Sequence, residues 1–309
     1  MAAYLARRIG QSLLTVFLTL TTVFLLVRLA PGDPAAAYAP PTASSADLQR
    51  IRAQFGLDGP LITQYGIFLR DLFTGDLGTS YSFRAPAFDV VMDRMPYTIT
   101  LAVSAIAVTT VIAVPLGVWM ARRADTKREL GANVLTIAGQ SMPDFWTGVM
   151  LLTVFAVLVP VLPASGFTSW SGLVLPTVTV AILQLALVSR LVRREMTVAL
   201  AAPYTTVARS RGVSERALAW RYGLRNSAVP LLTALGTRFA ALLNGVVVVE
   251  VVFGWPGVGS LVVRALATRD YPLIQATVVV TATLAILVQL IVDLAYPLLD
   301  PRVRLGKAA

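Results

Sequence analysis

Long apolar runs separated by polar segments dominate the hydrophobicity pattern of this chain. A hydrocarbon core about 30 Å thick needs roughly 20 apolar residues for one helical span, so runs of this length predict membrane-spanning helices. We expect six spans, over residues 9–27, 98–121, 131–159, 173–189, 228–252 and 273–299. The pattern therefore predicts an all-α membrane protein with six transmembrane helices, forming a single domain over residues 1–309.

Two features refine the expected spans. The first run follows Arg7-Arg8 and could be taken for a signal peptide, but the sequence Pro31-Gly32-Asp33-Pro34 after it is not a small-residue cleavage site, which favours an uncleaved span. Pro143-Asp144 interrupts the third run, and prolines and glycines between residues 160 and 176 divide an uncharged stretch into two spans joined by a hairpin. The basic run that starts at Arg190 is expected to end the fourth span.

Residues 31–96 form a polar region between the first and second spans, with seven acidic and five basic side chains. Two short helices are expected inside it. Ser45 is placed to cap a helix over residues 47–55 that ends at Gly56, and the apolar spacing of residues 61–72 predicts a helix ending near Gly75.

The distribution of basic residues orients the expected spans. Of the 26 Lys and Arg residues, 17 fall on the side that holds both termini and 7 on the other side, while Arg28 and Arg238 lie near or within spans. Because Lys and Arg are retained in the cytoplasm, both termini are expected to be cytoplasmic and residues 31–96 to lie outside. The net charge of +10 is explained by this role, so nucleic acid is not an expected partner, whereas membrane lipid is.

Composition excludes much familiar chemistry. The chain is 56% hydrophobic, more than one soluble core could bury, and it has no Cys and no His. Disulfides, thiolate nucleophiles, histidine metal sites and histidine acid-base chemistry are thereby excluded. There is no Gly-rich phosphate loop either, the nearest candidate being Gly306-Lys307-Ala308, so we expect no catalytic residue and no metal ligand.

The segment of residues 190–226 carries helix signals between the fourth and fifth spans. Pro203 suits a first helical position, Gly212 suits a position with positive φ after a helix, and Ser214 can cap a second helix that has Glu215 in its first turn. The pattern predicts helix, glycine elbow, helix, a form suited to sitting in a socket and transmitting force. The alternative is a basic loop that lies on anionic lipid headgroups.

Two stretches of this region, residues 204–212 and 225–230, resemble the coupling-loop signature of ABC importer permeases in the dipeptide, oligopeptide and nickel branch. Other motifs of that branch are matched in order at residues 30–34, 56–65, 75–80, 250–259, 269–272 and 299–302. The resemblance covers nearly the whole chain. Two positions depart from it: Thr206 stands where a basic residue is frequent, and Arg211 where a lysine is.

The resemblance implies a type I ABC importer permease in a bacterial inner membrane. It implies a second homologous permease subunit, two cytoplasmic ATPase subunits that use ATP and Mg²⁺, and an external substrate-binding protein that delivers peptides. This chain would then bind no cofactor itself. The residues that would contact the ATPase are Tyr204, Val207, Ala208, Arg209, Arg211 and Gly212.

Four charged residues fall in or near the spans: Asp144, Arg238, Glu250 and Asp293. A charge is costly in lipid, so each should face protein or water. Contact with the solute and a packing role both remain open for all four. Arg238 could also extend its charge toward the interface, and Asp293 could bond a neighbouring helix.

Three other functions are alternatives to peptide import. A nickel or other small-solute permease would carry the same motifs. An ion-driven secondary transporter is disfavoured because no inverted repeat is visible in the motifs. A membrane protease would need paired acids, for which Asp144 and Asp293 could be invoked, but neither lies in a protease motif.

Overall fold

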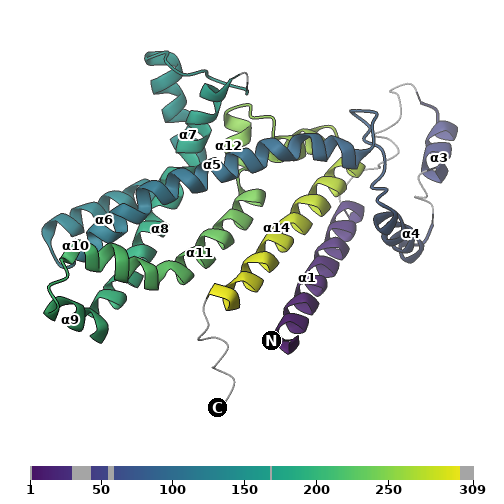
Figure 1. Cartoon of the computed structure of the whole chain (residues 1–309). Helices are drawn as coiled ribbons and strands as arrows, with labels where there is room; N and C mark the ends of the chain where they lie inside the picture. The colour runs from purple at the N-terminus through teal and green to yellow at the C-terminus, as the bar shows by residue number, and fades with distance from the viewer. Residues whose placement is uncertain (1, 30–42, 55–58, 168, 300–309) are drawn as a thin grey trace.

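The computed structural model describes residues 2–29, 43–54, 59–167 and 169–299, and most of this part of the chain is helical (Figure 1). Four of its helices are long and apolar enough to cross a membrane. They are α1 (Ala2–Leu29), α5 (Ala87–Arg122), α8 (Val174–Ala201) with the short turn before it, and α14 (Tyr271–Leu299). The expected all-α membrane fold is confirmed.

The other helices of the described residues are shorter. They are α3 (Ser45–Gln54), α4 (Leu61–Thr74), α6 (Lys127–Gln140), α7 (Asp144–Leu152), α9 (Pro203–Ser210), α10 (Glu215–Ala217), α11 (Leu224–Gly245), α12 (Val247–Val252) and α13 (Val258–Ala267). π-Helical turns over Thr153–Leu158 and Leu218–Gly223 follow α7 and α10.

The predicted third span is a broken helix. α6 and α7 together are long and apolar enough to span, but they meet at an angle of 93°. Pro143 precedes α7 in an extended conformation (φ −61°, ψ 143°), and a proline lacks the N–H that would continue the ladder from α6. The sequence therefore explains why the helix breaks at Pro143, but it does not predict the angle of 93° between α6 and α7.

The predicted fifth span is divided as well. α11 ends at Gly245, and α12 begins after Val246, whose backbone (φ −88°, ψ 7°) leaves the helical conformation. α11 also carries Arg225 and Arg238, and it is not among the four helices that meet the length and hydropathy requirement. With the bent pair α6 and α7 the described residues supply up to five spans, so the count of six stays a prediction.

The basic run that starts at Arg190 was expected to end the fourth span, but the helix itself does not end there. α8 continues through it to Ala201. The charges are accommodated by α6: Arg193 lies 2.8 Å from buried Glu129, and Arg190 donates to Gln140 Oε1 at 2.6 Å. A helix can pass through a basic run when a neighbouring helix supplies partners for it.

The cap of α3 is Ser44 and not Ser45. Ser44 Oγ accepts a hydrogen bond from the Asp47 N–H, and the Asp47 carboxylate accepts one from the Ser44 N–H in return, the reciprocal arrangement of a capping box. The expected end of this helix at Gly56 lies outside the described residues. α4 ends as expected at Gly75, which has a positive φ of 79°.

Helices α5 and α8 pack against each other, and the buried side chains of the described residues form three clusters. One cluster surrounds Trp255 and Leu101, a second joins the start of α5 to α13 and α14, and a third lies around Val192 and Met196. Large apolar side chains such as Leu13, Val111 and Ile291 remain exposed on the outer faces of the long helices. Such a surface suits a hydrocarbon surrounding.

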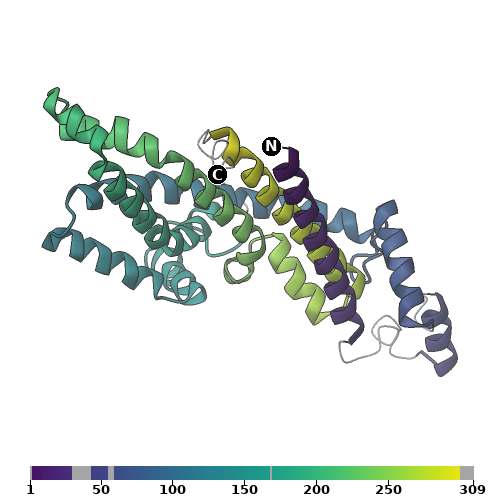
Figure 2. The same cartoon turned by 90° about the horizontal axis from the view of Figure 1, so that it is seen from below.

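The helices spread into an elongated arrangement with two distinct ends (Figures 1 and 2). α9 and α10 lie at one end, and α3 and α4 lie at the other. α1 packs along α14, and an ion pair of 3.1 Å joins Arg8 on α1 to Asp293 on α14. This layout places the candidate coupling segment far from the polar region after α1.

Candidate functional site

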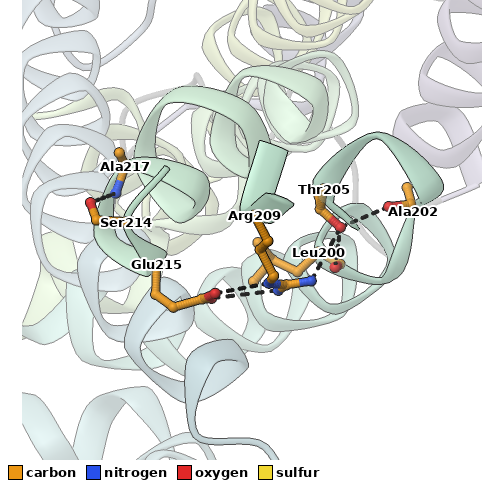
Figure 3. A network of polar contacts seen from close by, with 7 residues as sticks. All are labelled: Leu200, Ala202, Thr205, Arg209, Ser214, Glu215 and Ala217. Atoms are coloured by element: carbon orange, nitrogen blue, oxygen red, sulfur yellow. Dashed lines mark hydrogen bonds and ion pairs between the residues drawn. The ribbon is translucent and has the colours of Figure 1, made fainter. Parts of the chain in front are cut away.

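The candidate coupling segment begins where α8 ends. Ala202 adopts an extended backbone (φ −69°, ψ 148°), and Pro203 then occupies the first turn of α9, as predicted. The Thr205 hydroxyl, buried in the molecule, lies 2.7 Å from the carbonyl oxygen of Ala202 and 2.9 Å from that of Leu200 (Figure 3). It thereby ties the first turn of α9 to the last turn of α8, because a free helix-end carbonyl needs a partner.

The two faces of α9 differ sharply. Thr205 and Ala208 are buried against the rest of the chain, whereas Tyr204 and Val207 are exposed by 38% and 50%. Arg211, just after the helix, is exposed too. Ala208, one of the residues predicted to contact the ATPase, therefore faces inward and anchors α9. The face that carries Tyr204 and Val207 is the one exposed to a partner.

A glycine elbow closes α9, as the sequence predicted. Gly212 has φ 77°, its N–H donates to the Arg209 carbonyl oxygen at 2.9 Å, and the Val213 N–H donates to the Ala208 carbonyl oxygen at 3.1 Å. This pair of bonds is the Schellman motif, which needs a left-handed residue at its centre. A Cβ added to Gly212 would meet no atom within 4 Å, so the requirement for glycine is conformational and not steric.

The second helix of the segment is short but well anchored. Ser214 Oγ accepts a hydrogen bond from the Ala217 N–H, the predicted cap, and Glu215 lies in the first turn. The π-helical turn that follows buries Leu218 and Ala219. The elbow thus joins one helix with an exposed face to a segment fixed in the core.

An ion pair that sequence reasoning missed bridges the elbow. Arg209 Nε lies 2.8 Å from Glu215 Oε1, and Arg209 Nη2 lies 3.4 Å from Oε2 (Figure 3). The hydrogen bond from Arg209 lowers the pKa of Glu215, helped by the charge of nearby Arg122, and the same hydrogen bond raises the pKa of Arg209. Arg209 therefore closes the elbow from inside the segment, in addition to any contact that it makes with another protein.

Glu250 is the most enclosed of the four charged residues predicted in or near the spans. Its side chain is fully buried, and its carboxylate accepts hydrogen bonds from the Thr98 hydroxyl at 2.7 Å and the Ser260 N–H at 2.9 Å. A Cβ on Gly257 would overlap this carboxylate. The glycines after Trp255 thus leave room for Glu250, which ties α12, α13 and α5 together in a packing role.

The other three charges have different surroundings. Asp293 pairs with Arg8 and accepts from Gln289 at 3.3 Å, so it joins α14 to α1. Arg238 is half-buried in the middle of α11. Asp144 begins α7 and borders a cavity between α6, α8 and α11.

Asp270, for which the sequence suggested no role, anchors the loop before α5. Its buried carboxylate accepts from the hydroxyls of Ser80 and Ser82, both at 2.6 Å, and from the Ser82 N–H at 2.9 Å. Burial alone would raise the pKa of Asp270, but these hydrogen bonds outweigh it and lower the pKa below its usual value. The separation of some 190 residues between the partners leaves no local signal in the sequence.

Solved structures show which fold these helices form. The chain is similar to the MetNI methionine ABC transporter in an inward-facing conformation, with a TM-score of 0.55 at 16% identity over 68% of this chain and 96% of that one. An amino acid ABC transporter matches with a TM-score of 0.50 at 18% identity, over 69% of this chain and 94% of that one. At these identities the likeness concerns the fold, which is that of an ABC importer permease.

Family models and relatives cover nearly the whole sequence. The model of the binding-protein-dependent transport system inner membrane component matches residues 113–305, and the N-terminal model of such membrane components matches residues 1–102. The probable peptide ABC transporter permease y4tP of Sinorhizobium fredii is 36% identical over 98% of this chain and 100% of its own length. The dipeptide transport system permease DppB of Lactococcus lactis is 33% identical over 99% of this chain and 100% of its own length. The glutathione transport system permease GsiC of Escherichia coli is 34% identical over 98% of this chain and 99% of its own length.

These matches fix the class of the protein as a multi-pass permease of an ABC importer. The chain belongs to the family of binding-protein-dependent transport system inner membrane components, in its peptide branch.

Proposed function

We propose that this chain forms half of the pathway by which an ATP-driven importer moves peptides across a bacterial inner membrane. The observation that carries the proposal is the exposed face of α9, held at one end of the molecule by buried Thr205 and Ala208 and by the Gly212 elbow. A partner that pushes on this face moves the fixed segment behind it. Peptides are favoured over nickel because the relatives are named for peptide, dipeptide and glutathione transport.

The remaining parts of the importer are partners of this chain. A second, homologous permease subunit completes the pathway, two cytoplasmic ATPase subunits receive α9 and its counterpart, and an external binding protein delivers the peptide. ATP and Mg²⁺ belong to the ATPase subunits, and this chain binds no cofactor, because its sequence has no phosphate loop. The ATP hydrolysis that drives transport is therefore catalysed elsewhere.

Orientation follows the charge distribution. Both termini and the coupling segment of residues 190–226 lie in the cytoplasm, and residues 31–96 form an external region where the binding protein docks. Support comes from the excess of Lys and Arg on one side and from the layout that puts α9 and α4 at opposite ends.

Uptake into vesicles tests the proposal. The permease pair, its ATPases and its binding protein are reconstituted with ATP inside, and entry of a labelled dipeptide is followed. Uptake should require internal ATP and should be lost in Val207→Asp, which puts a charge on the exposed face of α9. Val161→Asp, at an exposed valine after α7, is the matched control and should transport normally.

Three results would overturn the proposal. Uptake driven by an ion gradient without ATP would identify a secondary transporter. ATP-driven uptake of nickel with no uptake of peptides would reassign the solute. Stoichiometric ATP binding by the purified chain alone would show that ATP binding does not belong only to the ATPase subunits.

A further inference from the structure

A cavity of about 320 Å³ opens between the break in the third span and the middle of α8. Its walls come from the end of α6, the start of α7, α8, the end of α11 and the start of α12. The 93° bend between α6 and α7 puts Gln140 and Asp144, on either side of the break, in the same lining. Two polar residues thus stand at the edge of the cavity, one on each side of the bend.

The lining is apolar apart from three side chains. Val180, Leu183 and Leu242 belong to the apolar wall, and the polar groups are Gln140, Gln184 and Asp144. Asp144 is the ionisable residue of this lining, and within the described part of the chain no ion pair to it occurs. A carboxylate with low-dielectric walls around it strongly favours a cation beside it.

Two amide side chains line the cavity beside the Asp144 carboxylate. Gln184 Oε1 is buried and has no hydrogen-bond partner in the structure. Gln140 Oε1 is already occupied, since it accepts from Arg190 Nη2 at 2.6 Å, and the same guanidinium also donates to the Ala186 carbonyl oxygen. Arg190 is thus committed to α6 and α8, whereas the Asp144 carboxylate has no ion-pair partner among the described residues.

We propose that this cavity receives the N-terminal ammonium group of a peptide in transit, with Asp144 as its charge partner. An ammonium group carries three N–H donors and a positive charge, which matches the Asp144 carboxylate. The cavity volume lies at the low end of the roughly 300–1,000 Å³ typical of small-ligand sites, so it suits the first one or two residues of a peptide. The inference rests on the proposed function and adds the part of the substrate that this chain recognises.

Peptide binding to the permease–ATPase complex without its binding protein tests the inference. The probes are labelled Ala-Phe and its N-acetyl derivative, which lacks the ammonium group. Asp144→Asn should weaken Ala-Phe binding roughly tenfold or more, because a charge-assisted hydrogen bond is lost, whereas Asp144→Glu should bind within a few fold of the wild type. The N-acetyl peptide should bind the wild type weakly and should be insensitive to Asp144→Asn.

Two further variants separate recognition from a structural effect. Ala241→Phe fills the cavity from an exposed lining position and should abolish binding without touching the carboxylate. Asp93→Asn removes an exposed acidic group on α5, outside the lining, and should leave binding unchanged. Thermal unfolding of each complex identifies a variant that has lost its fold.

The outcomes are distinct from those for the proposed function. Wild-type affinity for Ala-Phe in Asp144→Asn, or an equal loss for both probes, would overturn the ammonium site even while ATP-driven peptide uptake continued. If the wild-type vesicles instead took up another solute and no peptide, the proposed function would fail first.

Discussion

At the scale of single residues, the backbone of Gly212 determines how α9 meets the segment behind it. A side chain at φ 77° costs about 1–2 kcal/mol even where there is room for it, as there is here. We expect Gly212→Val to relieve this strain by tilting α9. Peptide uptake and the stimulation of ATP hydrolysis by loaded binding protein should be lost, while membrane insertion and docking of the binding protein should persist.

The matched control for this substitution is Gly131→Val. Gly131 lies within α6, and a Cβ there also meets nothing within 4 Å, but its φ is not positive. Normal coupling in Gly212→Val, measured as ATPase stimulation in vesicles, would contradict the role assigned to the elbow. If the segment merely rested on lipid headgroups, joint neutralisation of Arg211 and Arg216 would be the damaging change.

Asp270 gives the fold a pH dependence of defined sign. Its pKa is lowered in the folded state, so its hydrogen bonds contribute stability above the ordinary carboxyl pKa of about 3.9, and this contribution is lost as the pH falls through the folded-state value. We expect Asp270→Asn to lower the Tm at pH 7 and to flatten the fall in Tm below about pH 4. The measurement is thermal unfolding of the detergent-solubilised protein across pH.

The control for Asp270 is Asp93→Asn, which removes an exposed carboxylate on α5. Its profile should follow that of the wild type. A pH profile of Asp270→Asn that superimposed on the wild-type profile would show that the contacts to Ser80 and Ser82 carry no charge-dependent stability.

At the scale of elements, the hydrogen bonds of Glu250 hold α12 and α13 against α5. The Thr98 hydroxyl donates to Glu250 and also accepts from the Val258 N–H at 2.9 Å. Thr98→Val keeps the shape but removes both bonds, and it leaves a buried carboxylate short of a donor, which costs about 1–3 kcal/mol. We expect a lower Tm and lower uptake.

Thr100→Val is the matched control for Thr98→Val. The Thr100 hydroxyl donates to the Pro96 carbonyl oxygen within its own helix, so its loss should cost little. An equal fall in Tm for the two variants would mean that the Glu250 contacts are not what holds these helices together.

Helix-capping and turn signals in the sequence predicted the helices and the elbow of the coupling segment. They could not predict contacts between residues that are far apart in the sequence. Pro203, Gly212 and Ser214 each act through backbone groups a few residues away, so their types and spacing were sufficient. The orientation of α9 was not predictable in this way. That Ala208 faces inward depends on which side of the helix packs against the rest of the chain.

Two features that the sequence did not predict share one physical cause. The basic run after residue 189 was expected to end the fourth span, and the helix α8 continues through it because α6 supplies Glu129 and Gln140 as partners. Likewise the hydrogen bonds from Thr98 to Glu250 and from Ser80 to Asp270 join residues more than 150 positions apart. Hydropathy and turn signals describe a segment in isolation, whereas these contacts exist only after the helices have packed.

At the scale of the whole molecule, different segments occupy the two ends of the structure. α9 lies at one end and α3 and α4 at the other, in both views (Figures 1 and 2). α1 and α14 lie side by side, and their ion pair joins the first turns of α1 to the last turns of α14. The beginning of the chain and the end of its last long helix therefore lie on one side, which agrees with the charge distribution of the sequence.

Cysteine labelling of the assembled importer in intact cells tests this arrangement. The chain has no native Cys, so each introduced thiol is the only one in this subunit. Ser44→Cys, at the exposed start of α3, should react with a reagent that cannot cross the membrane. Ser210→Cys, exposed on α9, should react only after the membrane is opened, and less once the ATPase is bound.

Because Lys and Arg outnumber other charges on the α9 side and stay in the cytoplasm, the reverse pattern is not expected. Labelling of Ser44→Cys only from the cytoplasm, or of both positions from the same side, would refute the orientation proposed for this permease.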